Sequence, residues 1–230
     1  MSQLVVTPSL DGYVGLTSGN TTWHNIVTGS GTASSSGSRY VWLFQLYSDY
    51  MTENQWDDLR RGIFIFNTAG LPDDAVLTSA VLSFYITHKG DNGSFTPDLC
   101  LYSVATASDT DFVPADYGTF GTTEFSDKLT YASMTLNAWN NFTLNAAGLA
   151  SISKTGVSKF GVRNPSYDVA DELDPGNHNP VWVSGKTSYI YGYFRSEPGY
   201  SPYLTIDYTT AVGVSTGTGA HTVASMFQRM

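Results

Sequence analysis

The chain has 230 residues, a formal net charge of −9 and only 13% charged residues, so it lacks the Lys and Arg surplus that nucleic acids and anionic membranes attract. Its length suits one β-domain, and its 15 Tyr, 12 Phe and 22 Gly favour strands and tight turns. The single cysteine, Cys100, excludes an intrachain disulfide and is expected to be buried and inert. No apolar run approaches the roughly 18 residues of a membrane span.

The first sixty residues predict two strands separated by a long loop. Residues 1–14 are expected to form the first strand, and the Gly-, Ser- and Thr-rich residues 15–38 a loop of the length that is often functional. Strand character returns at 40–46. The polar residues 48–60 have the composition of a helical turn.

Residues 61–89 have the clearest pattern in the chain. Residues 62–66 are an apolar run, typical of a strand buried on both faces, and 67–74 contain Gly, Pro and two Asp, which favour a turn. From Val76 onward apolar and polar residues alternate for twelve residues, a period of two that a helix does not keep. The pattern predicts two core strands that form a central hairpin.

These residues also resemble a known family. The Leu-Pro-Asp-Asp-Ala turn at 71–75 and the Leu-Thr-Ser-Ala-Val-Leu-Ser-Phe-Tyr strand at 77–85 resemble the signature of DNRLRE-type jelly-roll modules. They are also similar to related domains of phage structural proteins and carbohydrate-binding modules. The Pro-Tyr-Leu-Thr-Ile-Asp-Tyr-Thr segment at 202–209 resembles the family's closing strand, whereas Asn67 stands where the family usually has Asp. The matches frame residues 11–210 and imply a jelly-roll fold, which by itself does not specify a function.

The remaining segments continue the strand pattern. Residues 105–128 are expected to be a long acidic connection, and Asn145 can cap a short helix over 146–152. The other expected elements are strands at 99–104, 140–144 and 157–163, a loop at 164–188, and closing strands at 189–195 and 203–208. About ten short strands without long helices predict an all-β, antiparallel β-sandwich of jelly-roll type with one short helix.

The last residues differ in composition, so residues 1–210 are expected to form the sandwich and 211–230 a C-terminal extension. A small-residue linker is followed by a short amphipathic end. We expect this extension to be an assembly arm that is ordered by contact with another chain or with a particle surface. Its side chains with apolar area to bury are Val223, Met226 and Phe227.

Aromatic side chains are the first candidate site. Tyr189, Tyr191 and Tyr193 alternate on one strand face, and Trp23 and Trp182 lie in expected loops, where we expect them to be exposed. These five residues predict a carbohydrate-binding platform, because aromatic rings pack against the C–H faces of sugars. The alternative is that they fill the core or a contact between subunits. Trp42, Trp56 and Trp139 are further candidates for the same platform.

Clustered acidic residues are the second candidate site. Asp168, Asp171, Glu172 and Asp174 lie within seven residues, and clustered carboxylate oxygens could bind calcium. Their spacing does not match an EF-hand, and the alternative is a solvated acidic loop. The four histidines are scattered without the spacing of a zinc site. No cofactor is therefore expected, unless this acidic loop binds calcium.

No catalytic motif accompanies these candidates. The chain has no nucleophile elbow, phosphate-binding loop or dinucleotide-binding turn, and its acidic residues lie in no recognisable catalytic arrangement. Arg61 and Arg163 border apolar strands and are expected to form structural ion pairs. The chain is therefore expected not to be an enzyme.

The expected function is that of a non-catalytic virion structural protein, a phage capsid decoration or fibre component displayed on the particle. This expectation combines the resemblance, the acidic, hydroxyl-rich composition and the lack of a recognisable signal peptide, which favours release by lysis. Its partners would be other virion proteins such as the major capsid protein, and further copies of itself. The alternative is an extracellular carbohydrate-binding module, acting as an adhesin or a substrate-targeting domain on cell-surface glycans. A polysaccharide-degrading enzyme is a third possibility.

Overall fold

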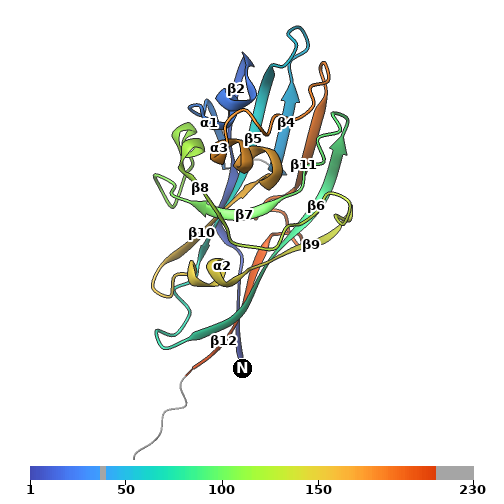
Figure 1. The fold of residues 1–230 in the computed structure, drawn as a ribbon. Helices are drawn as coiled ribbons and strands as arrows, with labels where there is room; N and C mark the ends of the chain where they lie inside the picture. The colour runs from blue at the N-terminus through green and yellow to red at the C-terminus, as the bar shows by residue number, and fades with distance from the viewer. Residues whose placement is uncertain (37–39, 211–230) are drawn as a thin grey trace, which may run out of the picture.

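The computed structural model describes residues 1–36 and 40–210, which fold into an antiparallel β-sandwich with short helical segments (Figure 1). This architecture confirms the predicted fold class. The strands are β1 (Ser2–Val6), β2 (Pro8–Thr21), β3 (Ala33–Ser35), β4 (Tyr40–Ser48), β5 (Trp56–Asn67), β6 (Val76–Asp91), β7 (Cys100–Val104), β8 (Phe120–Glu124), β9 (Ala138–Thr143), β10 (Val157–Arg163), β11 (Thr187–Tyr193) and β12 (Tyr203–Thr209). The helical segments are α1 (Trp23–Thr28), η1 (Pro114–Thr119), α2 (Ala146–Ala150), η2 (Pro165–Val169) and α3 (Ala170–Leu173).

The strands form one continuous hydrogen-bonded sheet that folds over itself. Neighbours follow the order β1-β12-β6-β11-β4-β5-β10-β7-β8, while β2 pairs with β3 and β5, and β9 pairs with β6. Strand β5 serves both layers, because residues 56–61 pair with β4 and residues 63–67 pair with β10. Across the core, Phe64 of β5 contacts Phe84 of β6 with ring centroids 5.6 Å apart.

The predicted hairpin over residues 61–89 is wrong in its pairing, although both strands exist. In the described sheet β5 pairs with β2, β4 and β10, whereas β6 pairs with β9, β11 and β12. The turn between them therefore carries the chain across the core instead of closing a hairpin. The predicted alternation of β6 is confirmed: Ala80, Leu82, Phe84 and Ile86 are buried on one face, and Ser83 is the one buried residue of the other.

Helical segments are more numerous than the single helix predicted. The expected helix is confirmed as α2, where the Asn145 side chain accepts the backbone N–H of Gly148 at 3.0 Å. The expected loop at 15–38 instead contains the end of β2, helix α1 and strand β3. Helix α1 begins after Thr22, whose side chain accepts the backbone N–H of Asn25. The helical turn expected within 48–60 is absent from the described structure, which has a turn and the start of β5 there.

One apolar core fills the space between the layers and contains side chains from strands β2, β4, β5, β6, β9, β10, β11 and β12. Cys100 is buried, as predicted, in a separate small cluster with Tyr102 and Val169, and its thiol donates to the carbonyl of Ser126 at 3.0 Å. Burial raises the pKa of this thiol, which keeps it protonated.

The two ends of the described chain lie at the same pole of the sandwich. Strands β1 and β12 pair there, with Ser2 opposite Tyr208 (Figure 1). The predicted assembly arm, with Val223, Met226 and Phe227, lies outside the described residues. Within the described residues, no helix is long and apolar enough to span a bilayer.

Candidate functional site

A row of aromatic side chains crosses the outer face of β4, β11, β6 and β9. It forms because Tyr189, Tyr191 and Tyr193 alternate with buried residues along β11, which leaves the three rings on the face away from the core. Rings from the neighbouring strands and from loop 194–202 continue the row. We call it the aromatic stripe, and it consists of Tyr40, Trp42, Tyr85, His88, Trp139, Tyr189, Tyr191, Tyr193, Tyr200 and Tyr203.

Tyr191 is at the centre of the aromatic stripe. Its ring centroid lies 4.4 Å from Trp42 on one side and 4.5 Å from His88 on the other. Tyr189 extends the row beyond Trp42, with centroids 6.4 Å apart. Tyr40 lies 5.6 Å from Tyr191, and the two tyrosines come from adjacent strands. The centre of the stripe is therefore a packed layer of rings that are half-buried, except for the exposed His88.

Tyr85 extends the stripe toward β9 and β12. It contacts Tyr193 at 5.9 Å, Trp139 at 5.5 Å and Tyr200 at 4.6 Å between ring centroids. Trp139 in turn contacts Tyr203 at 4.9 Å. Trp139 is 37% exposed and Tyr200 40% exposed, so this end offers free ring surface.

Polar groups accompany the rings of the stripe. The Arg60 guanidinium lies 5.2 Å from the Trp42 ring and 5.0 Å from the Tyr13 ring, and it donates to Asp58 at 2.9 Å. Partial burial and the neighbouring Tyr189 and Tyr40 hydroxyls raise the pKa of Tyr191. Its hydroxyl therefore stays protonated at neutral pH and can both donate and accept hydrogen bonds.

The structure places three of the five predicted platform residues in the stripe, namely the three tyrosines of β11. The exposure expected for Trp23 is wrong, because α1 turns its ring inward and leaves it 1% exposed against Trp56 at 5.4 Å. Trp182 is half-buried outside the stripe, and its Nε1 donates to the carbonyl of Gln55 at 3.0 Å.

Trp42 and Trp139 were candidates from the sequence, but other members of the stripe, such as Tyr40 and Tyr200, were not. Tyr40 and Trp42 flank a buried valine, so the period of two along this strand was a usable signal. The alternation after Val76 separates Tyr85 from the apolar face of its strand, but nothing local indicated that Trp139 of β9 would lie beside it. Tyr200 has no strand pattern at all, because it lies in loop 194–202.

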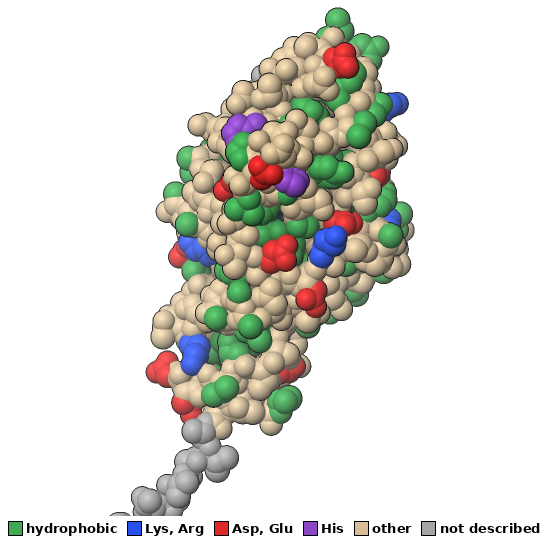
Figure 2. Space-filling model, viewed as in Figure 1, with side chains coloured by type: hydrophobic (Ala, Val, Ile, Leu, Met, Phe, Trp, Pro, Cys, Tyr) green, Lys and Arg blue, Asp and Glu red, His purple; other side chains and the backbone are tan. Residues whose placement is uncertain are grey.

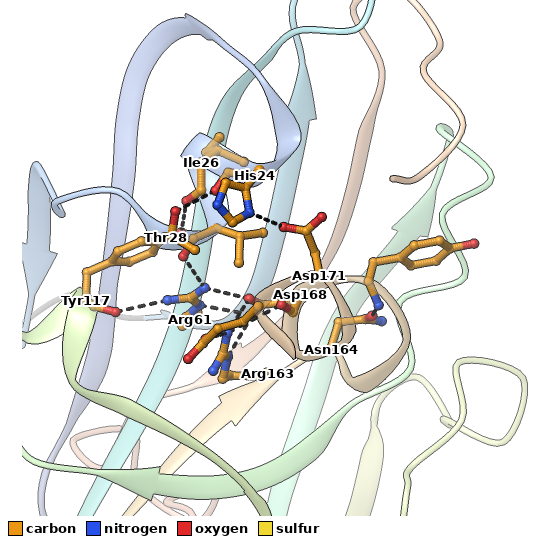
Figure 3. Close-up of polar contacts among 12 residues, drawn as sticks. His24, Ile26, Thr28, Arg61, Tyr117, Arg163, Asn164, Asp168 and Asp171 are labelled. Carbon is orange, nitrogen blue, oxygen red and sulfur yellow. Dashed lines mark hydrogen bonds and ion pairs between the residues drawn. The ribbon is translucent and has the colours of Figure 1, made fainter. Parts of the chain in front are cut away.

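The acidic loop folds into η2 and α3, and its carboxylates contact arginine and histidine side chains of the same chain. Asp168 accepts hydrogen bonds from Arg61 Nε at 3.0 Å and from Arg163 Nη2 at 2.8 Å (Figure 3). Glu172 accepts from Arg163 at 2.6 Å, and Asp171 lies 2.9 Å from Nδ1 of His24. These contacts confirm that Arg61 and Arg163 form structural ion pairs.

The predicted calcium ligands, Asp168, Asp171, Glu172 and Asp174, are not brought together as a ligand set. Among the described residues, no group of three or more His, Cys, Asp or Glu is placed to hold a metal ion. The solvated-loop alternative fails for Asp168 and Asp171, both fully buried, and describes only Glu172 and Asp174, which are exposed. The physical reason is that Arg61 of β5, Arg163 of β10 and His24 of α1 already contact Asp168, Glu172 and Asp171.

The buried ion pairs join the helical segments to the sandwich. Burial alone would raise the pKa of Asp168, but the charges of Arg163 and Arg61 hold it below its ordinary value. Arg61 also donates to the carbonyls of Tyr117 and Val27, which belong to η1 and α1 (Figure 3). Loss of this network would therefore release several segments at once.

The chain was compared with models of known protein families and with curated proteins. No family model matches the chain, and no curated protein matches it. The resemblance to DNRLRE-type modules therefore stays a prediction.

Proposed function

We propose that this chain is a non-catalytic binding module whose aromatic stripe recognises extended, neutral glycans. The observation that carries the proposal is the continuous contact of ten aromatic side chains across an outer sheet face. Aromatic rings cover the apolar C–H faces of sugar rings, and tyrosine hydroxyls hydrogen-bond to sugar hydroxyls. A row that crosses several strands suits a chain of sugar units better than a single one.

Charge favours a neutral glycan. The net charge of −9 repels sulfated and uronic-acid polymers as well as nucleic acids, although rows of aromatic rings can also stack bases. On the face seen in Figure 2, charged side chains are scattered among polar ones without a large patch of one sign. Nothing in this distribution would concentrate an anionic polymer.

The main competing occupant is another protein subunit, because Tyr, Trp and Arg are also enriched in protein interfaces. The composition of the stripe favours a sugar over a subunit. Its ten members are seven tyrosines, two tryptophans and one histidine, with no aliphatic side chain. The hydroxyl-bearing rings match a ligand that is apolar on its ring faces and polar at its edges.

The test is affinity electrophoresis and pull-down against a panel of neutral polysaccharides. Trp42→Ala and Tyr191→Ala remove the central rings and are expected to weaken binding at least tenfold, about 1.4 kcal/mol. Tyr50→Ala is the matched control, since Tyr50 is 69% exposed and lies outside the stripe. Absence of glycan binding, together with a dimer that Trp42→Ala dissociates, would show a subunit interface instead.

We also propose that the module is displayed on a phage particle as a capsid decoration or fibre component. The resemblance of residues 71–85 and 202–209 supports this setting. The pairing of β1 with β12 supports it too, because attachment through either end of the described chain leaves the aromatic stripe accessible. A capsid or portal gene beside the coding gene is expected, whereas a neighbouring glycosidase gene would favour an extracellular substrate-targeting domain.

A further inference from the structure

The outer sheet face carries a charged side chain where the aromatic stripe ends on β4. Arg60 of β5 lies between β4 and β2, opposite Gln45 of one strand and Gly15 of the other. Its guanidinium carbon lies 5.2 Å from the centroid of the Trp42 ring and 5.0 Å from that of the Tyr13 ring. We call Trp42, Arg60 and Tyr13 the guanidinium subsite. It continues the stripe across β5 onto β2.

Asp58 fixes the orientation of this guanidinium. Arg60 Nε donates to Oδ2 of Asp58 at 2.9 Å, and Nη2 lies 2.9 Å from the same oxygen. Asp58 is 7% exposed and also accepts from Gln45 Nε2 at 2.7 Å, so the carboxylate is itself held in place. Because the guanidinium is planar and rigid, these contacts also fix the direction of its remaining nitrogen, Nη1.

Each side chain of the subsite keeps one polar group for a ligand. Nη1 of Arg60, Nε1 of Trp42 and the hydroxyl of Tyr13 form no hydrogen bond with any residue that the structure describes. None of these three atoms is enclosed by the described part of the chain. The three side chains are half-buried, and that of Arg60 is 21% exposed. A molecule bound on this face can therefore reach these groups.

The polar groups of the subsite define the chemistry that it recognises. Arg60 Nη1 and Trp42 Nε1 only donate, so they need oxygen acceptors, while the Tyr13 hydroxyl can donate or accept. Adjacent hydroxyls of a sugar supply such oxygens at the edge of its ring, and the C–H face of the same ring packs against aromatic side chains. A carboxylate is a poorer match, because Asp58 already balances the charge of Arg60 and would repel it.

We propose that the guanidinium subsite binds one unit of a neutral glycan and that Arg60 determines which sugar is preferred. Arg60 Nη1 and Trp42 Nε1 donate to hydroxyl oxygens of that unit, whereas the rest of the stripe contacts the glycan mainly through ring faces. Ring faces tolerate many sugars, but a fixed donor discriminates between sugars whose hydroxyls point in different directions. The proposal rests on the glycan-binding function proposed above and adds the residue that reads hydroxyl orientation.

Variants of Arg60 test the subsite by affinity electrophoresis of the full chain. The probes are the neutral polymers hydroxyethylcellulose, glucomannan, galactomannan and laminarin, and the anionic polygalacturonate. Arg60→Lys keeps a cation beside Asp58 but removes the planar fork, and Arg60→Met keeps an unbranched stem beside the rings but removes every donor. Each is expected to weaken binding to the preferred polymer about tenfold, the loss typical of a hydrogen bond from a charged group. Each should also reduce the preference for that polymer over the others.

Controls separate recognition from folding and from charge. Lys186→Met removes one positive charge at an exposed position outside the stripe and should leave affinity and preference unchanged. Thermal unfolding shows whether each variant is folded at the temperature of the binding assay. In the wild-type chain labelled with ¹⁵N-arginine, the Arg60 Nε–H signal should shift saturably when a hexasaccharide with the backbone of the preferred polymer is added. This response needs no substitution.

The outcomes of these experiments are distinguishable. A wild-type chain that binds none of the neutral polymers would contradict the glycan-binding function, and the subsite with it. Binding that Tyr191→Ala abolishes, but that both Arg60 variants retain with unchanged affinity and preference, would overturn the subsite alone. Polygalacturonate that binds more tightly than any neutral polymer, and is lost in Arg60→Met, would show that Arg60 binds a carboxylate and would also overturn the proposal.

Discussion

At the scale of single residues, buried charges are the most informative feature of this chain. Asp168 is fully buried between Arg61 and Arg163, so each charge has a partner inside the protein. Asp11 is also fully buried, but its Oδ1 has no hydrogen-bond partner among the described residues, while Oδ2 accepts the backbone N–H of Arg195 at 2.8 Å. The ion pairs of Asp168 stabilise the folded chain, whereas Asp11 makes the stability of the folded chain depend on pH.

Asp168→Asn is expected to lower the free energy of unfolding by about 3–5 kcal/mol, because it leaves two buried guanidinium groups without their shared carboxylate. Urea denaturation measures the change. Asp174→Asn is the control and should change stability by less than about 0.5 kcal/mol, since Asp174 is exposed. An equal effect of both substitutions would contradict the role given to the ion pairs.

Asp11 predicts a loss of stability as pH rises. Burial raises its pKa to about 7 from an ordinary value of 3.8, although the Arg195 backbone N–H and charge oppose the shift. Between about pH 4 and pH 7 the folded chain keeps a proton that the unfolded chain releases. This contribution to stability is thus complete below pH 4 and is lost as pH approaches 7, with a slope of up to about 1.4 kcal/mol per pH unit.

Asp11→Asn removes this titration. Urea unfolding of wild type and variant at pH 5 and pH 8 should show that the variant gains stability relative to wild type at the higher pH. A stability difference that is the same at both pH values would exclude Asp11 as the titrating group.

At the scale of secondary-structure elements, strand β11 organises the aromatic stripe. It pairs with β4 on one side and with β6 on the other, which brings rings from three strands into contact. Its register shifts next to Tyr191, and Gly192 lies between two tyrosines of the stripe. A Cβ atom at Gly192 would lie 1.9 Å from the backbone oxygen of Tyr85, so the close approach of β11 to β6 requires glycine there.

Gly192→Ala is therefore expected to push β11 from β6 and to destabilise the fold by about 1–3 kcal/mol. It should also weaken glycan binding, because Tyr191 and Tyr193 would move. Thermal unfolding and affinity electrophoresis measure the two effects. Gly118→Ala is the matched control, since a Cβ there meets no atom within 4 Å, and it should change neither.

At the scale of the whole molecule, the sandwich places its ends and its aromatic stripe in different regions. The ends of the described chain lie beside the β1–β12 pair, whereas the centre of the stripe lies on β4, β11 and β6. A module built this way can be attached at one pole and bind a ligand on its side face.

The C-terminal extension supplies a prediction at this scale. Removal of residues 212–230 leaves β12 and every described contact in place, so the melting temperature should not change. If the extension is an assembly arm, the truncated chain should lose oligomerisation or particle binding, as measured by light scattering and co-sedimentation. A truncated chain that melts far lower but still assembles would show that the extension belongs to the core.

Several features followed from the sequence because they depend on neighbouring residues. The alternation after Val76 predicted a strand with one buried face, and Asn145 predicted the start of α2. The same local logic placed Tyr189, Tyr191 and Tyr193 on one face, and Cys100 in the interior. The alternation of side chains along a strand and the capping of a helix each depend on a few neighbouring residues. The local sequence is therefore enough to predict them.

Other features were decided only by the tertiary structure. The sequence offered no means to know that β5 and β6 cross the core instead of pairing, or that arginines from β5 and β10 would neutralise Asp168. It likewise could not show that Trp23 turns inward while Tyr200 joins the stripe. These outcomes depend on contacts between residues far apart in the chain, and such contacts form only when packing selects one set of strand neighbours from many that the same local patterns allow.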